Sequence, residues 1–284
     1  NPIDAISMAS RNCFDYYKLG NDFGGIGPGK VADILILDDL EKIKINKVML
    51  GGKIIVSNRK LVEKIQTPKV PTWMQKTVKI PKLQPKHFNV NSKNNVETVN
   101  TILMRTEIVT KKSSAELNVV NSNVSASYDK DIWKVAALDR TFGSKTKTVG
   151  FLENFGADIG AFASTWSFHE NDMIVIGSNE DDMADACNKL AKSQGGLIVV
   201  KDGKTLAFLP FQLGGIISTD PIDKVTKNFT KINDVLSDSG CNFKKPHLMP
   251  LFLPFLALPD IRILYSGIVD VKSRQFIPTI QTKL

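Results

Sequence analysis

The chain has 284 residues, 42% of them hydrophobic, which is enough for one large domain or two smaller ones that each bury a core. It contains no run of eighteen apolar residues and does not open with a charged segment followed by an apolar one, so we expect neither a membrane span nor a signal peptide. Three widely spaced cysteines without a CxxC pair favour a reduced compartment over disulfides or a zinc site, and we expect a cytoplasmic protein.

The net charge of +8 is concentrated in one segment. Residues 42–86 hold eleven lysines, one arginine and a single acidic residue, Glu63, so that this segment alone is strongly positive. Such a stripe could follow a phosphate backbone. Aromatic side chains that would stack on bases are scarce, because only Trp73 lies within the segment and Phe88 just beyond it. A solvated lysine-rich surface is therefore the favoured interpretation, and nucleic acid is a disfavoured partner.

The first sixty residues predict a helix followed by strands. Residues 1–20 place Ile3, Ile6 and Met8 on one helical face, with Gly20 as the end of the helix. The runs VADILILDD (31–39) and KINKVMLGGKIIVSNRK (44–60) read as strands, and the two glycines within the second run predict a hairpin.

A proline-containing segment follows. Residues 66–100 carry four prolines, many lysines and asparagines and no long apolar run, which predicts an extended basic connector and the boundary between domains.

From residue 104 onward the pattern is that of a compact α/β domain. Asn179 predicts the N-cap of a helix over 180–194, Asp202-Gly203 predicts a type I′ hairpin within 195–211, and a second helix is expected over 221–238. Strands rich in β-branched and aromatic residues are expected at 104–110, 133–140, 147–153, 161–168 and 173–179.

Two parts of the chain, one in each half, carry a resemblance to a known family. GIGPGKVADILILDD resembles the segment with which amidohydrolases leave their metal-bearing barrel for a small β-sandwich, and the residues before it are similar to that family's last barrel helix, with Cys13 and Phe14 in place of the usual Pro-Ala. The runs AFASTWSFHENDMIVIGSNEDDM, GGLIVVKDGKTLAFLPFQLGGIIS and FLPFLALPDIRILYSGIVDV are similar, in order and spacing, to the C-terminal domain of the adenine deaminases.

The resemblance implies a fold and an activity. The expected fold class is mixed α/β: residues 1–22 as the last barrel helix, 23–65 as β-sandwich strands, 66–103 as the basic linker and 104–284 as the C-terminal α/β domain. The implied reaction is hydrolysis of adenine to hypoxanthine and ammonia, with a divalent metal, manganese or iron, held in a barrel that precedes Asn1. The implied partners are a purine substrate and that barrel domain, and a homo-oligomer is left open.

Site residues are harder to assign. His87, His169 and His247 are isolated, without the paired spacing of a metal site, and each reads best as a satisfied core or surface histidine. Where the family usually has A-H-D-S-H-N, this chain has Ser167 to Asp172, so that one histidine is lost in either alignment. His169, Glu170 and Asp172 could still orient a ligand or a water; a polar turn between two strands is the alternative. The altered motif also leaves open a non-catalytic or substrate-shifted member of the family.

Overall fold

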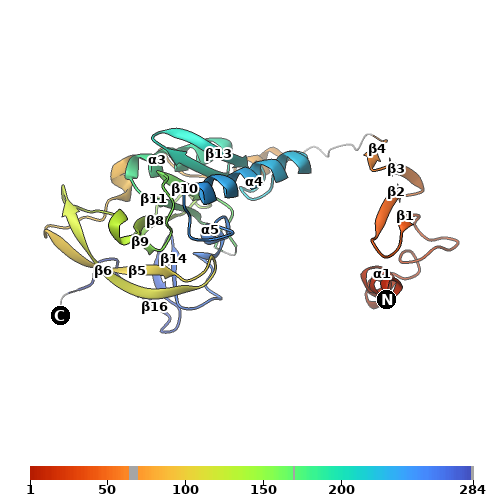
Figure 1. Ribbon diagram of the computed structural model, residues 1–284, viewed down its shortest axis with the longest axis horizontal. Coiled ribbons are helices and arrows are strands. Elements are labelled where there is room, and N and C mark those ends of the chain that lie inside the picture. The colour runs from red at the N-terminus through yellow and green to blue at the C-terminus, as the bar shows by residue number, and fades with distance from the viewer. Residues whose placement is uncertain (64–69, 169, 283–284) are drawn as a thin grey trace. The chain divides into compact units, whose positions relative to one another are not determined.

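The protein folds as two compact units, Asn1–Lys69 and Val70–Leu284, and each is described here by itself. The computed structural model describes residues 1–63, 70–168 and 170–282, and Figure 1 shows their helices and strands. Both units combine helices with antiparallel sheet, so the predicted mixed α/β class is confirmed.

The first unit is a pair of short helices followed by a four-stranded antiparallel sheet in the order β1-β2-β3-β4. The predicted hairpin at Gly51 and Gly52 is confirmed, because both glycines take positive φ between β2 and β3. The elements are α1 (Pro2–Ala9), α2 (Arg11–Tyr16), β1 (Ile34–Asp39), β2 (Lys44–Leu50), β3 (Lys53–Ser57) and β4 (Lys60–Leu61).

The prediction of one helix over residues 1–20 is wrong in its continuity. The helix breaks at Ser10, where φ is −133°, and the Ser10 hydroxyl donates to the Ile6 carbonyl at 2.6 Å. A serine that satisfies a local backbone group in this way competes with the helical ladder. The second piece ends at Tyr16, before the predicted stop at Gly20.

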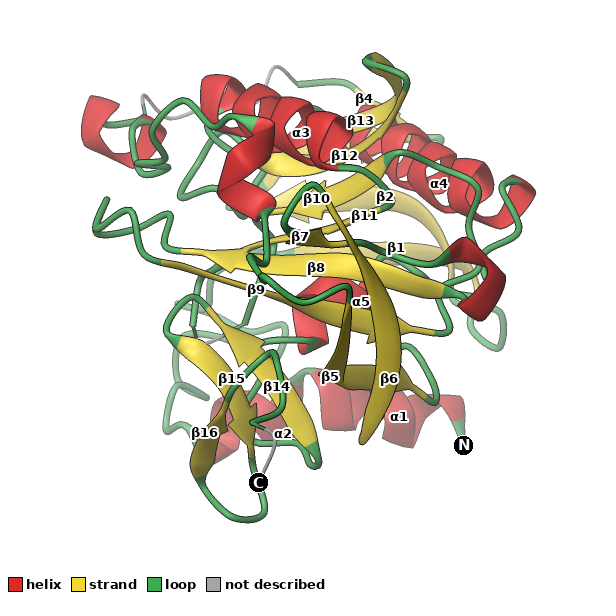
Figure 2. Ribbon diagram, turned by 90° about the vertical axis from the view of Figure 1, so that its left-hand side faces the viewer, coloured by secondary structure: helices red, strands yellow, loops and turns green. Residues whose placement is uncertain are grey.

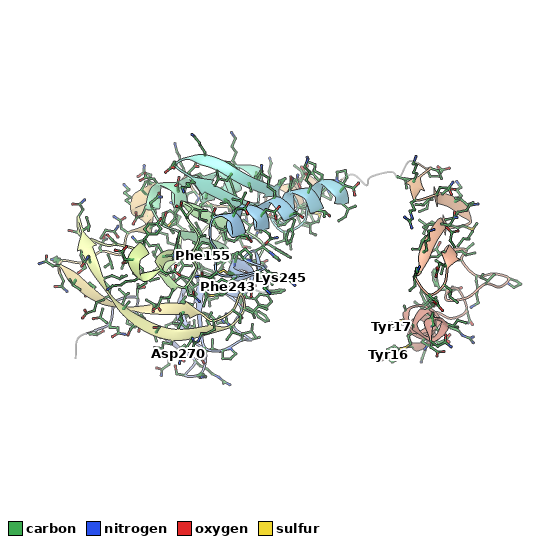
Figure 3. The ribbon with its side chains drawn as sticks, in the orientation of Figure 1. Tyr16, Tyr17, Phe155, Phe243, Lys245 and Asp270 are labelled. Atoms are coloured by element: carbon green, nitrogen blue, oxygen red, sulfur yellow. The ribbon has the colours of Figure 1, made fainter. Side chains whose placement is uncertain are left out.

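The first unit has no side chain that is buried among its described residues. Tyr16 and Tyr17, which pack edge to face at the end of α2, are 80% and 71% exposed (Figure 3). Leu35 and Ile36 of β1 are also exposed, on opposite faces of the strand. This unit therefore presents its apolar side chains without a core of its own. The expected barrel remnant and sandwich stay predictions, because one sheet and two helices define neither.

The second unit is built on a nine-stranded sheet in the order β13-β12-β10-β11-β8-β9-β5-β6-β7. Only the β5–β9 pair is parallel among these strands. Their bounds are β5 (Val96–Met104), β6 (Thr110–Val120), β7 (Asn123–Val124), β8 (Ile132–Leu138), β9 (Lys147–Glu153), β10 (Ala161–Ser164), β11 (Met173–Gly177), β12 (Gly196–Lys201) and β13 (Lys204–Pro210).

The remaining elements cover this sheet or extend the unit. They are the 3-10 turns η1 (Thr72–Gln75), η2 (Pro85–Phe88) and η3 (Tyr128–Lys130), the helices α3 (Glu180–Ser193), α4 (Ile222–Asp238) and α5 (Leu248–Phe252), and a three-stranded sheet of β14 (Ile261–Leu264), β15 (Gly267–Asp270) and β16 (Gln275–Ile277). Figure 2 shows α3 and α4 as the long helices of this unit.

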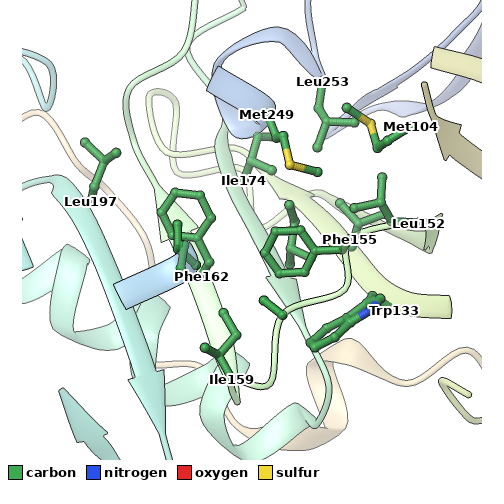
Figure 4. Packing of buried hydrophobic residues seen from close by; sticks show 14 of the residues in the cluster. Met104, Trp133, Leu152, Phe155, Ile159, Phe162, Ile174, Leu197, Met249 and Leu253 are labelled. Atoms are coloured by element: carbon green, nitrogen blue, oxygen red, sulfur yellow. The ribbon is translucent and has the colours of Figure 1, made fainter. Parts of the chain in front are cut away.

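The side-chain alternation of the central strands divides the core into two layers. Phe162 of β10 packs in one cluster with residues of α4, α5 and β14, whereas its neighbours Ala161 and Ala163 pack in another with residues of α3. Successive residues of a strand point to opposite faces, so α3 and α4 cover opposite faces of the sheet. Figure 4 shows the first cluster, in which Phe155 and Trp133 meet edge to face at 5.1 Å.

The predicted connector over 66–103 is wrong for residues 70–103. Val78, Leu83 and Phe88 are buried against the α3 face of the sheet, and β5 occupies an interior position between β9 and β6. The prolines led to the error, because this segment crosses the sheet in extended form and takes its hydrogen bonds from side chains: Asn188 of α3 pairs with both backbone groups of Leu83. Residues 66–69 lie outside the described residues.

The predicted strand at 104–110 is also wrong. Met104 ends β5, Thr110 begins β6, and residues between them form a turn in which the Thr106 hydroxyl accepts from the Ile108 and Val109 amides. The helix capped by Asn179, the hairpin at Asp202-Gly203 and the helix ending before Gly240 are confirmed. Among the described residues, no helix has the length and apolar character needed to cross a bilayer.

Candidate functional site

The loop between β10 and β11 lies at one end of the nine-stranded sheet. In the sheet, Leu138 at the end of β8 pairs with Met173 at the start of β11. Ser164 at the end of β10 pairs with Ile174 of β11 and Leu197 of β12, so β8 and β10 end where β11 and β12 begin. The polar residues that follow β8 and β10 are therefore brought to one edge. The loop spans 165–172 and contains the predicted site residues Glu170 and Asp172; His169 lies outside the described residues.

Asp172 is the most perturbed carboxyl of this edge. Its side chain is 1% exposed, and one oxygen accepts the Tyr265 amide at 2.9 Å. Burial raises its pKa to about 7, and the nearby carboxylates Glu170 and Asp139 act in the same direction, whereas the Tyr265 amide and Arg140 oppose the rise. A carboxyl with a pKa near neutrality can hold or release a proton under ordinary conditions, as a general acid or base must.

Arg140 supplies the positive charge beside Asp172. It is 3% exposed, and burial lowers its pKa to about 10 while the attraction of Asp172 raises it. Its guanidinium donates to the Gly214 carbonyl at 3.0 Å and to the Asn171 side-chain oxygen at 3.4 Å. Gly215 makes room for it, since a Cβ there would lie 2.7 Å from a guanidinium nitrogen.

Several polar atoms of these loops keep unused hydrogen-bonding capacity. Arg140 Nε, Ser167 Oγ and Glu170 Oε2 are buried and have no hydrogen-bond partner among the described residues. Buried polar atoms in native proteins are nearly always paired with protein, water or a ligand. Two of the three come from the loop that the sequence selected, which makes this edge the best candidate for binding a polar molecule.

An apolar hollow adjoins the same loop. Trp166 lines a cavity of about 380 Å³ together with Phe211, Ile217 and Phe229. Trp166 also stacks on His247, with ring planes 11° apart. The edge thus combines a charged cluster with an aromatic wall.

His247 and His87 have the hydrogen bonds of ordinary structural histidines. His247 Nδ1 lies 2.6 Å from the Asn233 side-chain oxygen, and burial, followed by the charge of Lys245, lowers its pKa to about 4. His87 Nδ1 accepts the Gln84 amide at 2.9 Å. No three His, Cys, Asp or Glu side chains of the described chain lie together in a way that could hold a metal ion.

Sequence reasoning missed Arg140, Asp139 and Tyr265. Asp139 and Arg140 come directly after a strand that is buried along its whole length, and a charged pair in that position was a usable signal. Tyr265 sits in the turn after β14, 93 residues from Asp172, and no local pattern links the two.

The family models agree with the division into two units. A model described as "Adenine deaminase C-terminal domain" matches residues 107–275, and one described as "Amidohydrolase family" matches residues 1–55. These matches define the class of protein as the amidohydrolases.

Comparison with curated proteins narrows the family assignment from the amidohydrolases to the adenine deaminases. The chain is 53% identical over 280 residues to a protein named adenine deaminase from Cenarchaeum symbiosum, covering 99% of this chain and 46% of that protein. It is 33% identical to the adenine deaminase of Desulforamulus reducens, covering 99% of this chain and 48% of that protein. The chain belongs to the adenine deaminase C-terminal domain family, and it spans about half the length of the curated relatives it matches.

Proposed function

We propose that this chain is the C-terminal part of an adenine deaminase, which hydrolyses adenine to hypoxanthine and ammonia. The observation that carries the proposal is that nearly the whole chain aligns with proteins of that name while spanning about half of their length. The reacting groups and a divalent metal, manganese or iron, belong in this proposal to an amidohydrolase barrel that precedes Asn1. The protein acts in the cytoplasm on a small purine, and its oligomeric state is left open.

The apolar surface of the first unit supports this proposal. Phe14, Phe23 and Ile34 line an apolar hollow of about 410 Å³, and the described part of the unit buries no side chain. Apolar patches of this kind mark surfaces that another segment covers. We assign the cover to the barrel, with residues 1–22 as its last helix, broken at Ser10, and residues 23–65 as strands of the adjoining sandwich.

In this proposal the edge formed by residues 165–172 faces the substrate opening. Asp172, Glu170 and His169 would orient a water or a polar edge of the purine, and Arg140 would keep the charge of Asp172 balanced. The pKa of Asp172, raised to about 7 chiefly by burial, suits a residue that exchanges a proton near neutral pH. These are positioning roles, because the bond-breaking groups lie in the barrel.

A non-catalytic or substrate-shifted enzyme is the second candidate. The altered motif favours it, because Phe168 stands in place of the first histidine and packs on Phe252 and Phe255 at ring distances of 4.9 and 5.1 Å. Asn171 accepts from Arg140 in place of the second histidine.

The test compares this chain with the longest natural chain that contains it. Chromatographic detection of hypoxanthine from adenine should give turnover with the longer chain and none with this chain alone. A longer chain that carries a barrel and leaves adenine unchanged would reject the first candidate. Turnover that appears only after Ser167→Ala, Phe168→His and Asn171→His would establish the second.

A further inference from the structure

The lysine-rich segment that follows residue 70 forms one wall of a separate cavity on the second unit. This cavity, of about 260 Å³, lies between residues 80–87 and the ends of β8 and β9. None of the residues 165–172 lines it, although Asp139 both lines this cavity and acts on the charge of Asp172. Charged and apolar side chains both line it, among them Lys82, Lys145, Lys147 and Leu138.

Three lysines of this lining are not neutralised by carboxylates of the described residues. Lys82, Lys145 and Lys147 form no ion pair with any residue that the structure describes. Elsewhere in the second unit, lysines such as Lys201 and Lys189 pair with aspartates at 2.8 and 2.6 Å. A cavity wall with three unpaired lysines attracts an anion.

The single carboxylate of the lining, Asp139, is held by its own loop. Its two oxygens accept the amides of Thr141 and Phe142 at 2.9 Å and of Ser144 at 2.8 Å. These bonds shape the turn that presents Lys145, whose φ of +63° is rare for a residue with a side chain. Strained backbone at a ligand-sized cavity is a common feature of binding loops.

His87 adds a donor of defined position. Its Nδ1 accepts the backbone amide of Gln84, so in the neutral ring the proton is on Nε2. The wall that carries His87 is fixed to α3 and to the sheet, because Leu83 is bonded through both backbone groups to Asn188 of α3 and the Phe88 carbonyl accepts Lys134 Nζ of β8. The cavity is therefore preformed.

We propose that this cavity binds a small phosphate monoester. A phosphate dianion offers three strong acceptor oxygens and close to two negative charges, which match several ammonium groups and an imidazole N–H. The apolar side chains of Ile80, Leu83 and Leu138 favour an organic group on the phosphate over the free ion. The volume is just below the usual range for drug-sized ligands, and it suits a small one. The proposal does not depend on the deaminase activity.

The test is calorimetric titration of the 284-residue chain with adenosine monophosphate, adenosine and inorganic phosphate. We expect saturable binding of adenosine monophosphate, weaker binding of inorganic phosphate, and binding of adenosine weaker than that of the monophosphate by roughly ten-fold or more. Lys145→Gln/Lys147→Gln should weaken the monophosphate by at least roughly ten-fold. The charge-matched control is Lys227→Gln/Lys231→Gln on the exposed side of α4, which should change the affinity less than about two-fold.

Four results would overturn the proposal. They are no saturable binding of the monophosphate, equal affinity for adenosine, equal weakening by the control variant, or binding of a single-stranded oligonucleotide by a chain that leaves the monophosphate unbound. The last would identify a nucleic-acid surface. Lys82→Gln, on the opposite wall, is a second variant if the double substitution fails to fold, and it should weaken the monophosphate in the same direction.

Discussion

The ion pair between Lys134 and Glu180 gives the sharpest test of the second unit. Lys134 of β8 is 1% exposed and donates to Glu180 at 2.5 Å, to the Asn123 side chain at 2.9 Å and to the Phe88 carbonyl at 3.1 Å. Burial lowers the pKa of Lys134, and the bond to Glu180 opposes this shift. Glu180 therefore compensates the ammonium charge of Lys134, which the sheet buries away from solvent.

Removing one partner should cost more than removing both. Glu180→Ala leaves a buried ammonium with only neutral acceptors, and we expect the free energy of unfolding to fall by about 3 kcal/mol. In Lys134→Met/Glu180→Ala no charge is stranded, so the loss should be about 1 kcal/mol smaller than in Glu180→Ala alone. Asp181→Ala, the neighbouring exposed acid of the first helical turn, loses only its interaction with the helix dipole and should cost at most about 1 kcal/mol.

Urea unfolding followed by tryptophan fluorescence measures these differences. All three tryptophans, Trp73, Trp133 and Trp166, belong to the second unit, so the signal reports that unit alone. A double variant as unstable as the sum of Lys134→Met and Glu180→Ala would refute the reasoning, because additivity means that the two side chains do not depend on each other.

Three further predictions concern buried polar groups. Asp172 has a pKa of about 7 in the folded protein against an ordinary 3.8, so the contribution of its protonated carboxyl to stability is complete below pH 3.8 and is lost as the pH rises towards 7. Asp172→Asn should therefore raise the free energy of unfolding at pH 8 by up to about 4 kcal/mol, and urea titrations should show the smallest increase near pH 4. Gly215→Ala should cost about 1 kcal/mol more than Gly203→Ala, because both glycines have φ near +70° but only a Cβ at 215 meets Arg140. Arg262 is fully buried and donates to four backbone carbonyls, so Arg262→Met should lower the unfolding free energy by about 3 kcal/mol or more, and a change below 1 kcal/mol would contradict that role.

The sequence predicted correctly those caps and turns that depend on residues close together in the chain. Asn179 caps α3 through the Asp182 amide at 2.8 Å, and Asp202-Gly203 turns with positive φ at both residues. Both depend on chemistry within four residues. The hairpin at Gly51 and Gly52 belongs to the same kind.

The errors arose where distant residues supply the missing partners. Leu83 is buried because Asn188, 105 positions later, bonds its backbone, and nothing in the proline-rich segment indicates this. In the candidate site, too, the local residues were predicted and their distant partners were not. The sequence selected Glu170 and Asp172 from one loop, but the arginine that balances them comes after β8 and the amide that holds Asp172 comes from Tyr265.

Strand β1 shows what the composition of a strand cannot predict. Its Ile-Leu-Ile-Leu run is apolar on both faces, a composition typical of strands that are covered on both sides. In β11, the apolar run Met173–Gly177 is buried along its whole length, whereas in β1 Leu35 and Ile36 stay 55% and 42% exposed. The two strands read alike in sequence, so composition specifies that a face requires cover without identifying what provides it. Leu35 and Ile36 therefore require a cover that the described residues of their own unit do not provide.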